Sequence, residues 1–170
     1  MDAVSDQKYT IHLINSEEDA KKAIEFFLSD FSFDDRNFTP GELEHMKTCT
    51  LDSLKEENFY YWCVKNNKNE IIGLLGVREN EQKTGGYKGD SCVIHRNYRN
   101  EGIALKMHEI MFEHLKSVGA RYLIIETCNT DYYKPIRKLL SQLGFEKIGH
   151  CPHYYYENEG LVWYLKRFDV

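Results

Sequence analysis

Apolar and polar positions alternate at the start of the chain and then change to a helical spacing. Residues 9–14 alternate as a strand does. Ser16, followed three residues later by Asp19, resembles a capping box. These signals predict an opening strand followed by a helix over residues 17–28.

A second helix start follows a stretch rich in Asp and Phe. Residues 29–38 are predicted to be a loop. Thr39 is a suitable N-cap, Pro40 occupies the first helical position, and an acid stands at the third. The helix that begins here is expected to reach about Lys55.

Two β-type runs come next, over residues 59–65 and 71–78. The turn-forming residues 66–70 between them predict a hairpin. A glycine-containing loop then leads to a further strand that ends at residues 91–94. From Gly102 the apolar positions return to helical spacing as far as residue 118.

The last third of the chain alternates between strands and helices. Gly119 is the expected stop of the preceding helix. A strand, a helix and two closing strands are predicted over residues 122–127, 135–142, 145–150 and 161–165. The order of elements predicts an α/β or α+β fold with a mixed sheet, in a single domain over residues 1–170.

Composition and charge narrow the function classes. The 170 residues are 42% hydrophobic and 29% charged, as is usual for a globular domain. No apolar stretch approaches a membrane span, and residues 1–6 do not resemble a signal peptide, so we expect a cytoplasmic protein. The net charge of −5 argues against nucleic acid as a partner and weakly favours a cationic substrate.

The cysteines and histidines do not predict a metal site. The five cysteines are scattered without a CxxC pair, and the seven histidines are equally dispersed. Buried, reduced thiols are the expected state of the cysteines. We therefore predict that no metal is bound.

The turn between the strand ending at Ile94 and the helix opening at Gly102 is a candidate anion site. Unpaired N–H groups at a helix start attract phosphate, and glycine allows the backbone to approach it closely. Arg99 can add charge-assisted contacts, and Ala104 keeps the next position small. Taken alone, the turn is equally consistent with an ordinary strand–turn–helix connection.

The sequence from Val93 to Ala104 resembles the acetyl-coenzyme A motif of the GCN5-related N-acetyltransferases (GNAT). That motif is a hydrophobic strand followed by Arg/Gln-x-x-Gly-x-Gly/Ala, which residues 99–104 match. Downstream, residues 123–127 and Leu143-Gly144-Phe145 are similar to the next strand of the family and to its closing Gly-Phe pair. The resemblance extends from about Tyr87 to Lys166 and implies the GNAT fold, a mostly antiparallel mixed sheet flanked by helices.

The resemblance implies a reaction and a cofactor-binding set. An acetyl group would pass from acetyl-coenzyme A directly to a primary amine, without a covalent enzyme intermediate. Backbone groups of Cys92 and Ile94 would bind the pantetheine arm and the acetyl carbonyl. The complete set of cofactor-binding residues is Cys92, Val93, Ile94, Arg99, Asn100, Glu101, Gly102, Ile103, Ala104 and Asn129.

Proton transfer requires a base and an acid. Asp90 matches the place where some family members carry a Glu and is the leading base candidate, although a solvated acid at a strand start is an equal alternative. Leu140 occupies the position where the family often has a tyrosine as general acid. Tyr133 is the first substitute, and one of Tyr154–Tyr156 is the next.

The early loop and the C-terminal segment are expected to select the acceptor. Asp30, Asp34, Asp35 and three phenylalanines lie in the loop, and residues 153–159 add aromatic and acidic side chains. Aromatic walls with acids suit an amine that has an apolar body, but an acidic solvated loop is as plausible. The acceptor class stays open between a small amine, an amino-acid derivative, an antibiotic, and the N-terminus or a lysine of a peptide.

Alternatives remain at the level of function and assembly. The chain could be a catalytically weak relative that binds acyl-coenzyme A as a sensor or interaction module, which Leu140 favours, or an unrelated α/β binding domain. The C-terminal strand could pair with a second copy to form a homodimer or close the sheet of its own chain.

Overall fold

A seven-stranded mixed sheet is the centre of the computed structural model, which describes residues 8–168. Residues 1–6, where no signal peptide is expected, lie outside this range. The strand order is β1-β2-β3-β4-β5-β7-β6, and every neighbouring pair is antiparallel except β4–β5. The strands are β1 (Tyr9–Leu13), β2 (Phe59–Asn66), β3 (Ile71–Glu79), β4 (Gly86–Ile94), β5 (Tyr122–Cys128), β6 (Glu146–Tyr156) and β7 (Glu159–Arg167).

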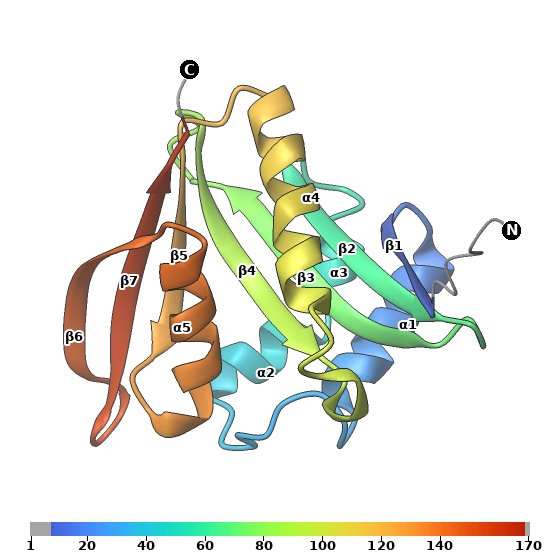
Figure 1. Cartoon of the computed structure of the whole chain (residues 1–170), viewed down its shortest axis with the longest axis horizontal. Helices are drawn as coiled ribbons and strands as arrows, with labels where there is room; N and C mark the ends of the chain where they lie inside the picture. The colour runs from blue at the N-terminus through green and yellow to red at the C-terminus, as the bar shows by residue number, and fades with distance from the viewer. Residues whose placement is uncertain (1–7, 169–170) are drawn as a thin grey trace, which may run out of the picture.

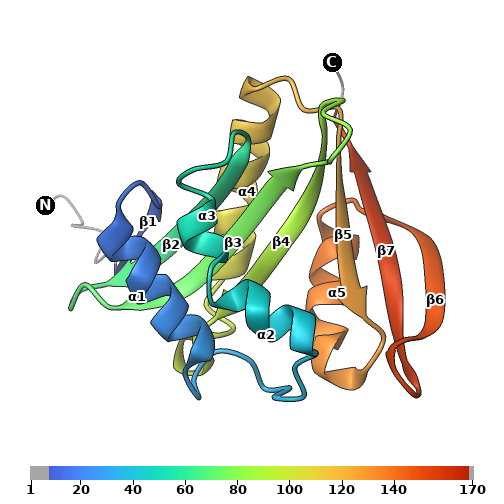
Figure 2. The same cartoon turned by 180° about the vertical axis from the view of Figure 1, so that it is seen from behind.

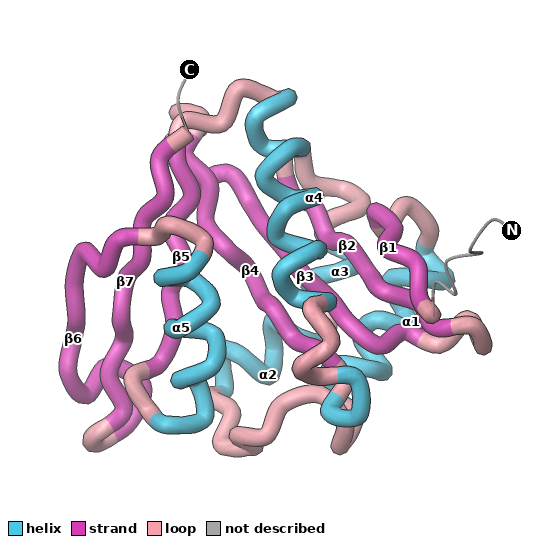
Figure 3. Tube along the Cα trace, in the orientation of Figure 1, coloured by secondary structure: helices cyan, strands magenta, loops and turns pink. Residues whose placement is uncertain are grey.

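Helices cover both faces of the sheet (Figures 1 and 2). One face carries α4 (Ile103–Ser117) and α5 (Lys134–Gln142), and the other carries α1 (Glu17–Leu28), α2 (Pro40–Met46) and α3 (Cys49–Asp52). The tube in Figure 3 shows loops at both ends of the sheet, including those beside α2 and before the start of α4. Each face has its own cluster of buried apolar side chains, as a two-sided sheet requires.

Local sequence signals account for several helix ends. The Ser16 hydroxyl accepts a hydrogen bond from the Asp19 N–H and caps α1. Thr39 and Glu42 form a complete capping box at α2. At the end of α4, Gly119 has a φ of 74°, which confirms it as the stop.

The predicted continuous helix from Pro40 to about Lys55 is wrong. The chain leaves helical geometry at Thr48, where φ is −132°, and α3 starts in a new direction. The buried Thr50 hydroxyl donates a hydrogen bond of 2.7 Å to the carbonyl of Ala20 in α1. This contact and the burial of Cys49 seat α3 against α1, so tertiary packing overrides the continuous helical pattern.

The C-terminal strands differ from the prediction in length and order. Strand β6 continues to Tyr156, six residues beyond the predicted end at residue 150. The last strand, β7, inserts between β5 and β6, so both of its edges are paired within the chain. The C-terminal strand therefore closes the sheet, and β6 forms the sheet edge. Within residues 8–168, no helix is long and apolar enough to cross a membrane.

Candidate active site

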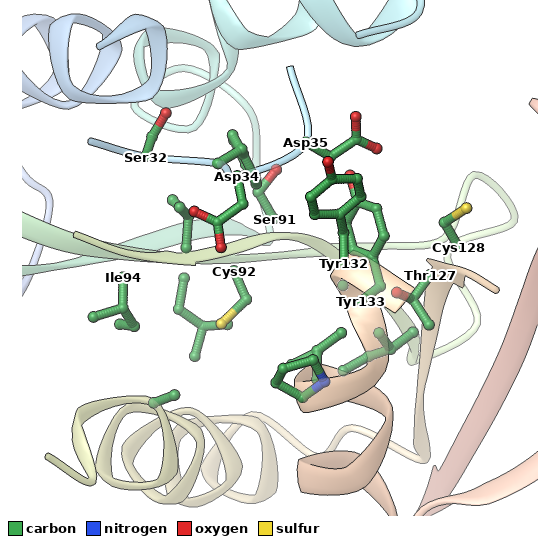
Figure 4. Close-up of a pocket in the computed structure, with 18 of the residues that line it drawn as sticks. Ser32, Asp34, Asp35, Ser91, Cys92, Ile94, Thr127, Cys128, Tyr132 and Tyr133 are labelled. Atoms are coloured by element: carbon green, nitrogen blue, oxygen red, sulfur yellow. The ribbon is translucent and has the colours of Figure 1, made fainter. Parts of the chain in front are cut away.

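A cavity opens where β4 and β5 separate. The two parallel strands pair only through Gly86–Lys88 and Tyr122–Ile124 and diverge beyond that point. A cavity of about 620 Å³ lies in the gap, with β4, α4, the end of β5, the start of α5 and the 29–39 loop as its walls. Figure 4 shows the loop above β4, with Tyr132 and Tyr133 entering from the α5 side.

The turn before α4 presents unpaired backbone donors to this cavity. Within residues 8–168, no backbone N–H from Arg99 to Leu105 donates a hydrogen bond to the protein. Gly102, the N-cap of α4, has a φ of 79°, and a Cβ built on it would meet no atom within 4 Å. Free donors, the positive end of a 15-residue helix and an open approach at Gly102 fit a pyrophosphate.

The Arg99 side chain donates its hydrogen bonds to groups of the protein itself. Its Nε donates to the Ile94 carbonyl at 3.1 Å, and its two terminal nitrogens donate to Asp34 Oδ2 and the Ser32 carbonyl, each at 2.5 Å. Arg96 also pairs with Asp34, at 3.3 Å. These bonds tie the 29–39 loop to the motif and thereby set the roof of the cavity.

Several other residues of the motif face the cavity. The His95 N–H bonds to Ile72 of β3 at 2.7 Å, so strand alternation turns the N–H groups of Ile94 and Cys92 toward the open edge. Asn100, Ile103 and Ala104 line the cavity with them.

Two predicted cofactor residues, Glu101 and Asn129, do not belong to the cavity wall. Val93 does belong to it, although its side chain also packs into the core cluster on the α1 face. Glu101 is exposed. Asn129 turns away toward β7, where its Oδ1 accepts the Gly160 N–H at 2.9 Å.

Cys92 has no base beside it within the described residues. The imidazole of His95 lies on the other face of β4, stacked on Phe31 with ring centroids 4.7 Å apart. Burial raises the pKa of the Cys92 thiol to about 12. The thiol is therefore protonated at neutral pH, and the geometry offers no nucleophilic cysteine there.

Asp90 lies in a β-bulge of β4, opposite Gly76 of the neighbouring strand β3. Leu75 pairs with Cys92 and Val77 with Gly89, so Asp90 and Ser91 together face Gly76. A Cβ on Gly76 would lie 2.3 Å from the Tyr61 ring, so only glycine lets this ring pack over β3.

The Tyr61 hydroxyl donates a hydrogen bond to Asp90 Oδ2. On the other side, His45 Nε2 lies 2.9 Å from Oδ1 and 2.8 Å from Oδ2. Asp90 thus forms a hydrogen-bonded cluster with Tyr61 and His45, here called the Asp90 cluster, and is not a solvated acid.

Sequence reasoning missed the partners of Asp90. A ring nitrogen of His45, the Cys49 Sγ and a carboxylate oxygen of Asp90 lie within 4.8 Å of one another. The hydrogen bond to Asp90 is the main cause that raises the pKa of His45, against an opposing effect of burial. His45 and Cys49 are four residues apart, which is one signal in the sequence that could have linked them, although a helix break intervenes.

Tyr133 lines the cavity, whereas Leu140 does not. Burial and then the charge of Asp35 raise the pKa of Tyr133, so its phenol keeps its proton at neutral pH. Tyr155, also at the cavity wall, has a raised pKa that is due first to burial. Leu140 is fully buried in the core, and its neighbour Leu139 takes the place at the cavity wall.

The predicted acceptor region is brought together only in part. Phe33 and Phe38 stand at the wall in an edge-to-face pair with centroids 5.8 Å apart. The Tyr156 hydroxyl donates to the Phe38 carbonyl at 3.2 Å and joins the C-terminal hairpin to the loop. Phe31 instead packs on His95, and Asp30 is almost fully exposed.

Acidic side chains outnumber basic ones at this wall. The acids are Asp34, Asp35, Glu42, Asp90, Glu126 and Glu159, and Arg99 is the one arginine or lysine among the described wall residues. Asp34 is paired with Arg99, Glu126 with Lys88 and Asp90 with His45. The carboxylates of Asp35, Glu42 and Glu159 therefore contribute most to a negative potential at this wall. Such a cavity attracts a cation.

The mixed sheet with its diverging parallel strands, beside a candidate anion site at the start of α4, is the arrangement expected of the GNAT fold, and the family comparison agrees. The model of the Acetyltransferase (GNAT) family matches residues 12–145. The chain belongs to the GNAT acetyltransferase family. This membership rejects the alternative of an unrelated α/β binding domain. Comparison with curated protein sequences gives no match.

Solved structures show the same fold at low identity. A protein from Desulfovibrio desulfuricans, described as a GNAT-family acetyltransferase, has a TM-score of 0.80 at 15% identity over 94% of this chain and 98% of its own. The ribosomal-protein-S5-alanine acetyltransferase of Vibrio fischeri has a TM-score of 0.71 at 19% identity, over 96% and 94%. An aminoglycoside 6′-N-acetyltransferase complexed with coenzyme A has 0.70 at 13% identity, over 93% and 96%.

Proposed function

We propose that this protein is a single-domain, cytoplasmic N-acetyltransferase that moves an acetyl group from acetyl-coenzyme A to a primary amine by direct attack. The observation that carries the proposal is the run of unpaired N–H groups from Arg99 to Leu105 at the mouth of the cavity. Family membership supports the reaction class.

The cofactor would lie along the open edge of β4. Backbone N–H groups from Arg99 to Ala104 would hold the pyrophosphate, and those of Cys92 and Ile94 would bind the pantetheine arm and the acetyl carbonyl. A donor aimed at that carbonyl oxygen stabilises the negative charge that develops as the amine attacks. Acetyl-coenzyme A supplies the activated acetyl group, and the protein holds the two reactants together.

Asp90 and Tyr133 would manage the protons. The Asp90 cluster stands at the cavity wall, where it can accept a proton from an ammonium group. Tyr133 carries a proton at neutral pH because its pKa is raised, so it can protonate the departing thiolate. A tyrosine at residue 133 would thus do what a tyrosine at residue 140 does in other members of the family.

The acceptor would be a cation with an apolar body. Phe33, Phe38 and Tyr155 offer flat apolar surface beside the carboxylates of Asp35 and Glu42. This combination suits an amino group attached to an aliphatic or cyclic frame. Small amines, aminoglycosides and peptide N-termini all have such groups.

A calorimetric titration with acetyl-coenzyme A tests the first half of the proposal, and saturable binding is expected. Release of the coenzyme A thiol is then followed with a diamine, an aminoglycoside and an alanine-starting peptide. Binding without amine-dependent release would favour the sensor alternative, in which Leu140 marks a weakened catalyst. Absence of binding would contradict both functions.

A further inference from the structure

The exposed member of the Asp90 cluster is His45. The His45 side chain is 37% exposed and lines the cavity, whereas the Asp90 side chain is 12% exposed. Both oxygens of Asp90 face His45 Nε2, and Oδ2 also accepts the buried Tyr61 hydroxyl. An amine that enters the cavity therefore meets the imidazole more readily than the carboxylate.

We infer that His45 is the group that takes the proton from the acceptor amine, and that Asp90 is the positioning residue for its imidazole. The inference rests on the proposed transferase function and revises the part assigned to Asp90. The Nε2–H donates to the Asp90 carboxylate, so the lone pair at Nδ1 is the acceptor site of the ring. Among residues 8–168, no side chain or backbone group hydrogen-bonds to this Nδ1.

The charges around the imidazole set its proton affinity. Asp90 on β4 and Asp52 on α3 favour the protonated ring, whereas burial and Arg78 on β3 oppose it. The two other titratable neighbours are neutral. Burial raises the pKa of Cys49 to about 12 and holds that of Tyr61 well above its ordinary value. The pKa of His45 is therefore held above the ordinary histidine value, and the neutral ring is a stronger base than a free imidazole.

The proton balance of the reaction is complete. One N–H bond of the ammonium group breaks, and its proton moves to His45 Nδ1. The freed nitrogen lone pair forms the C–N bond to the acetyl carbon, and the C–S bond then breaks. The nitrogen, positively charged after the attack, then loses a second proton. This proton moves by way of Tyr133 to the coenzyme A thiolate and neutralises it. The products are an amide, coenzyme A and one proton, which His45 releases to solvent.

The His45→Gln variant tests this assignment. Gln retains an amide N–H that can donate to Asp90, but it cannot accept a proton at neutral pH. The matched control is His12→Gln, because His12 on β1 is exposed and, among residues 8–168, its side chain hydrogen-bonds to Thr10 alone. We expect His45→Gln to lower kcat/KM by about 10²–10⁴-fold, the usual worth of a general base, while acetyl-coenzyme A binding stays within about threefold of wild type.

The pH profile separates a proton carrier from a structural residue. In the wild type, kcat/KM rises with pH through an inflection above about 6.5, the ordinary histidine value. In His45→Gln this inflection disappears, and in Asp90→Asn it moves to lower pH because the anionic partner is gone. An inflection that persists in His45→Gln but vanishes in Asp90→Asn would identify Asp90 as the base and overturn the inference.

An NMR titration of the histidine side chains needs no acceptor. The His45 signal, identified by its loss in His45→Gln, is expected to titrate above about 6.5 and to shift downward in Asp90→Asn. A His45 titration unchanged by Asp90→Asn would contradict the pairing itself. Activity that is lost on chelation and restored by Zn²⁺ would make the cluster a metal site and also overturn the inference. Lack of acetyl-coenzyme A binding by the wild type would instead reject the proposed function.

Discussion

Replacing Gly102 by alanine tests whether the start of α4 binds the cofactor, because the expected loss of cofactor affinity can be separated from the expected loss of stability. Gly102 has a left-handed backbone, with φ 79° and ψ 9°, and a Cβ there meets no atom within 4 Å. The cost in the free protein is therefore the left-handed conformation alone, about 1–2 kcal/mol for an alanine. In a domain of this size, that lowers Tm by about 2–8 °C.

The expected effect on cofactor affinity is larger. The Cβ would project into the open space where the pyrophosphate is proposed to approach. Loss of one charge-assisted hydrogen bond costs about 1.5–3 kcal/mol, which corresponds to a roughly ten- to hundredfold weaker Kd for acetyl-coenzyme A. Isothermal titration calorimetry at a temperature well below Tm measures this change directly.

Gly119 provides a matched control at the other end of the same helix. Its φ is 74°, and a Cβ on it also meets nothing within 4 Å. Gly119→Ala should lower Tm by a similar amount and leave the Kd for acetyl-coenzyme A unchanged. If both variants bind acetyl-coenzyme A as tightly as the wild type, the pyrophosphate does not lie at Gly102, and the reasoning is refuted.

Three further predictions concern other parts of the cavity and core. Tyr133→Phe should lower kcat by about a hundredfold with little change in acetyl-coenzyme A affinity; an equal loss in Tyr155→Phe, measured in the same thiol-release assay, would argue against a specific proton donor. Asp34→Ala removes the partner of two arginines and should loosen the 29–39 loop, so steady-state kinetics should show a larger rise in KM for the amine than for acetyl-coenzyme A. Burial lowers the pKa of His108, so below about pH 6.5 the unfolded state takes up a proton that the folded state refuses. The free energy of unfolding, measured in urea, should therefore be lower at about pH 5.5 than at about pH 7.5. The difference between the two pH values should be smaller in His108→Gln.

Strong local signals in the sequence predicted much of the fold. The caps at Ser16 and Thr39 and the stop at Gly119 act within a few residues, so the sequence pattern contains them. The bend at Thr48 was missed because it depends on a contact between Thr50 and the distant Ala20. A helical pattern alone does not contain that contact.

The turn at the start of α4 was the part of the candidate site that the sequence could predict. The Gly102 turn is a contiguous motif, so its residues could be named before the structure was known. The pairing of His45 with Asp90 joins positions 45 residues apart. It depends on the bulge opposite Gly76 and on the helix break, and neither has a signature in the local pattern. Asn129 faces Gly160 because β7 inserts beside β5, a strand order that the sequence did not reveal.

The bond between Tyr156 and the Phe38 carbonyl has a consequence for how the protein could change during evolution. It joins the 29–39 loop to the β6–β7 hairpin, and neither segment contains the Gly102 turn. If these segments select the acceptor as proposed, substitutions that retain the Asp34 and Ser32 contacts with Arg99 would change acceptor preference while the cofactor turn and the β4–β5 junction keep their geometry. A new amine specificity could therefore be selected, or engineered, by exchanging residues 29–39 and 152–159 as a pair.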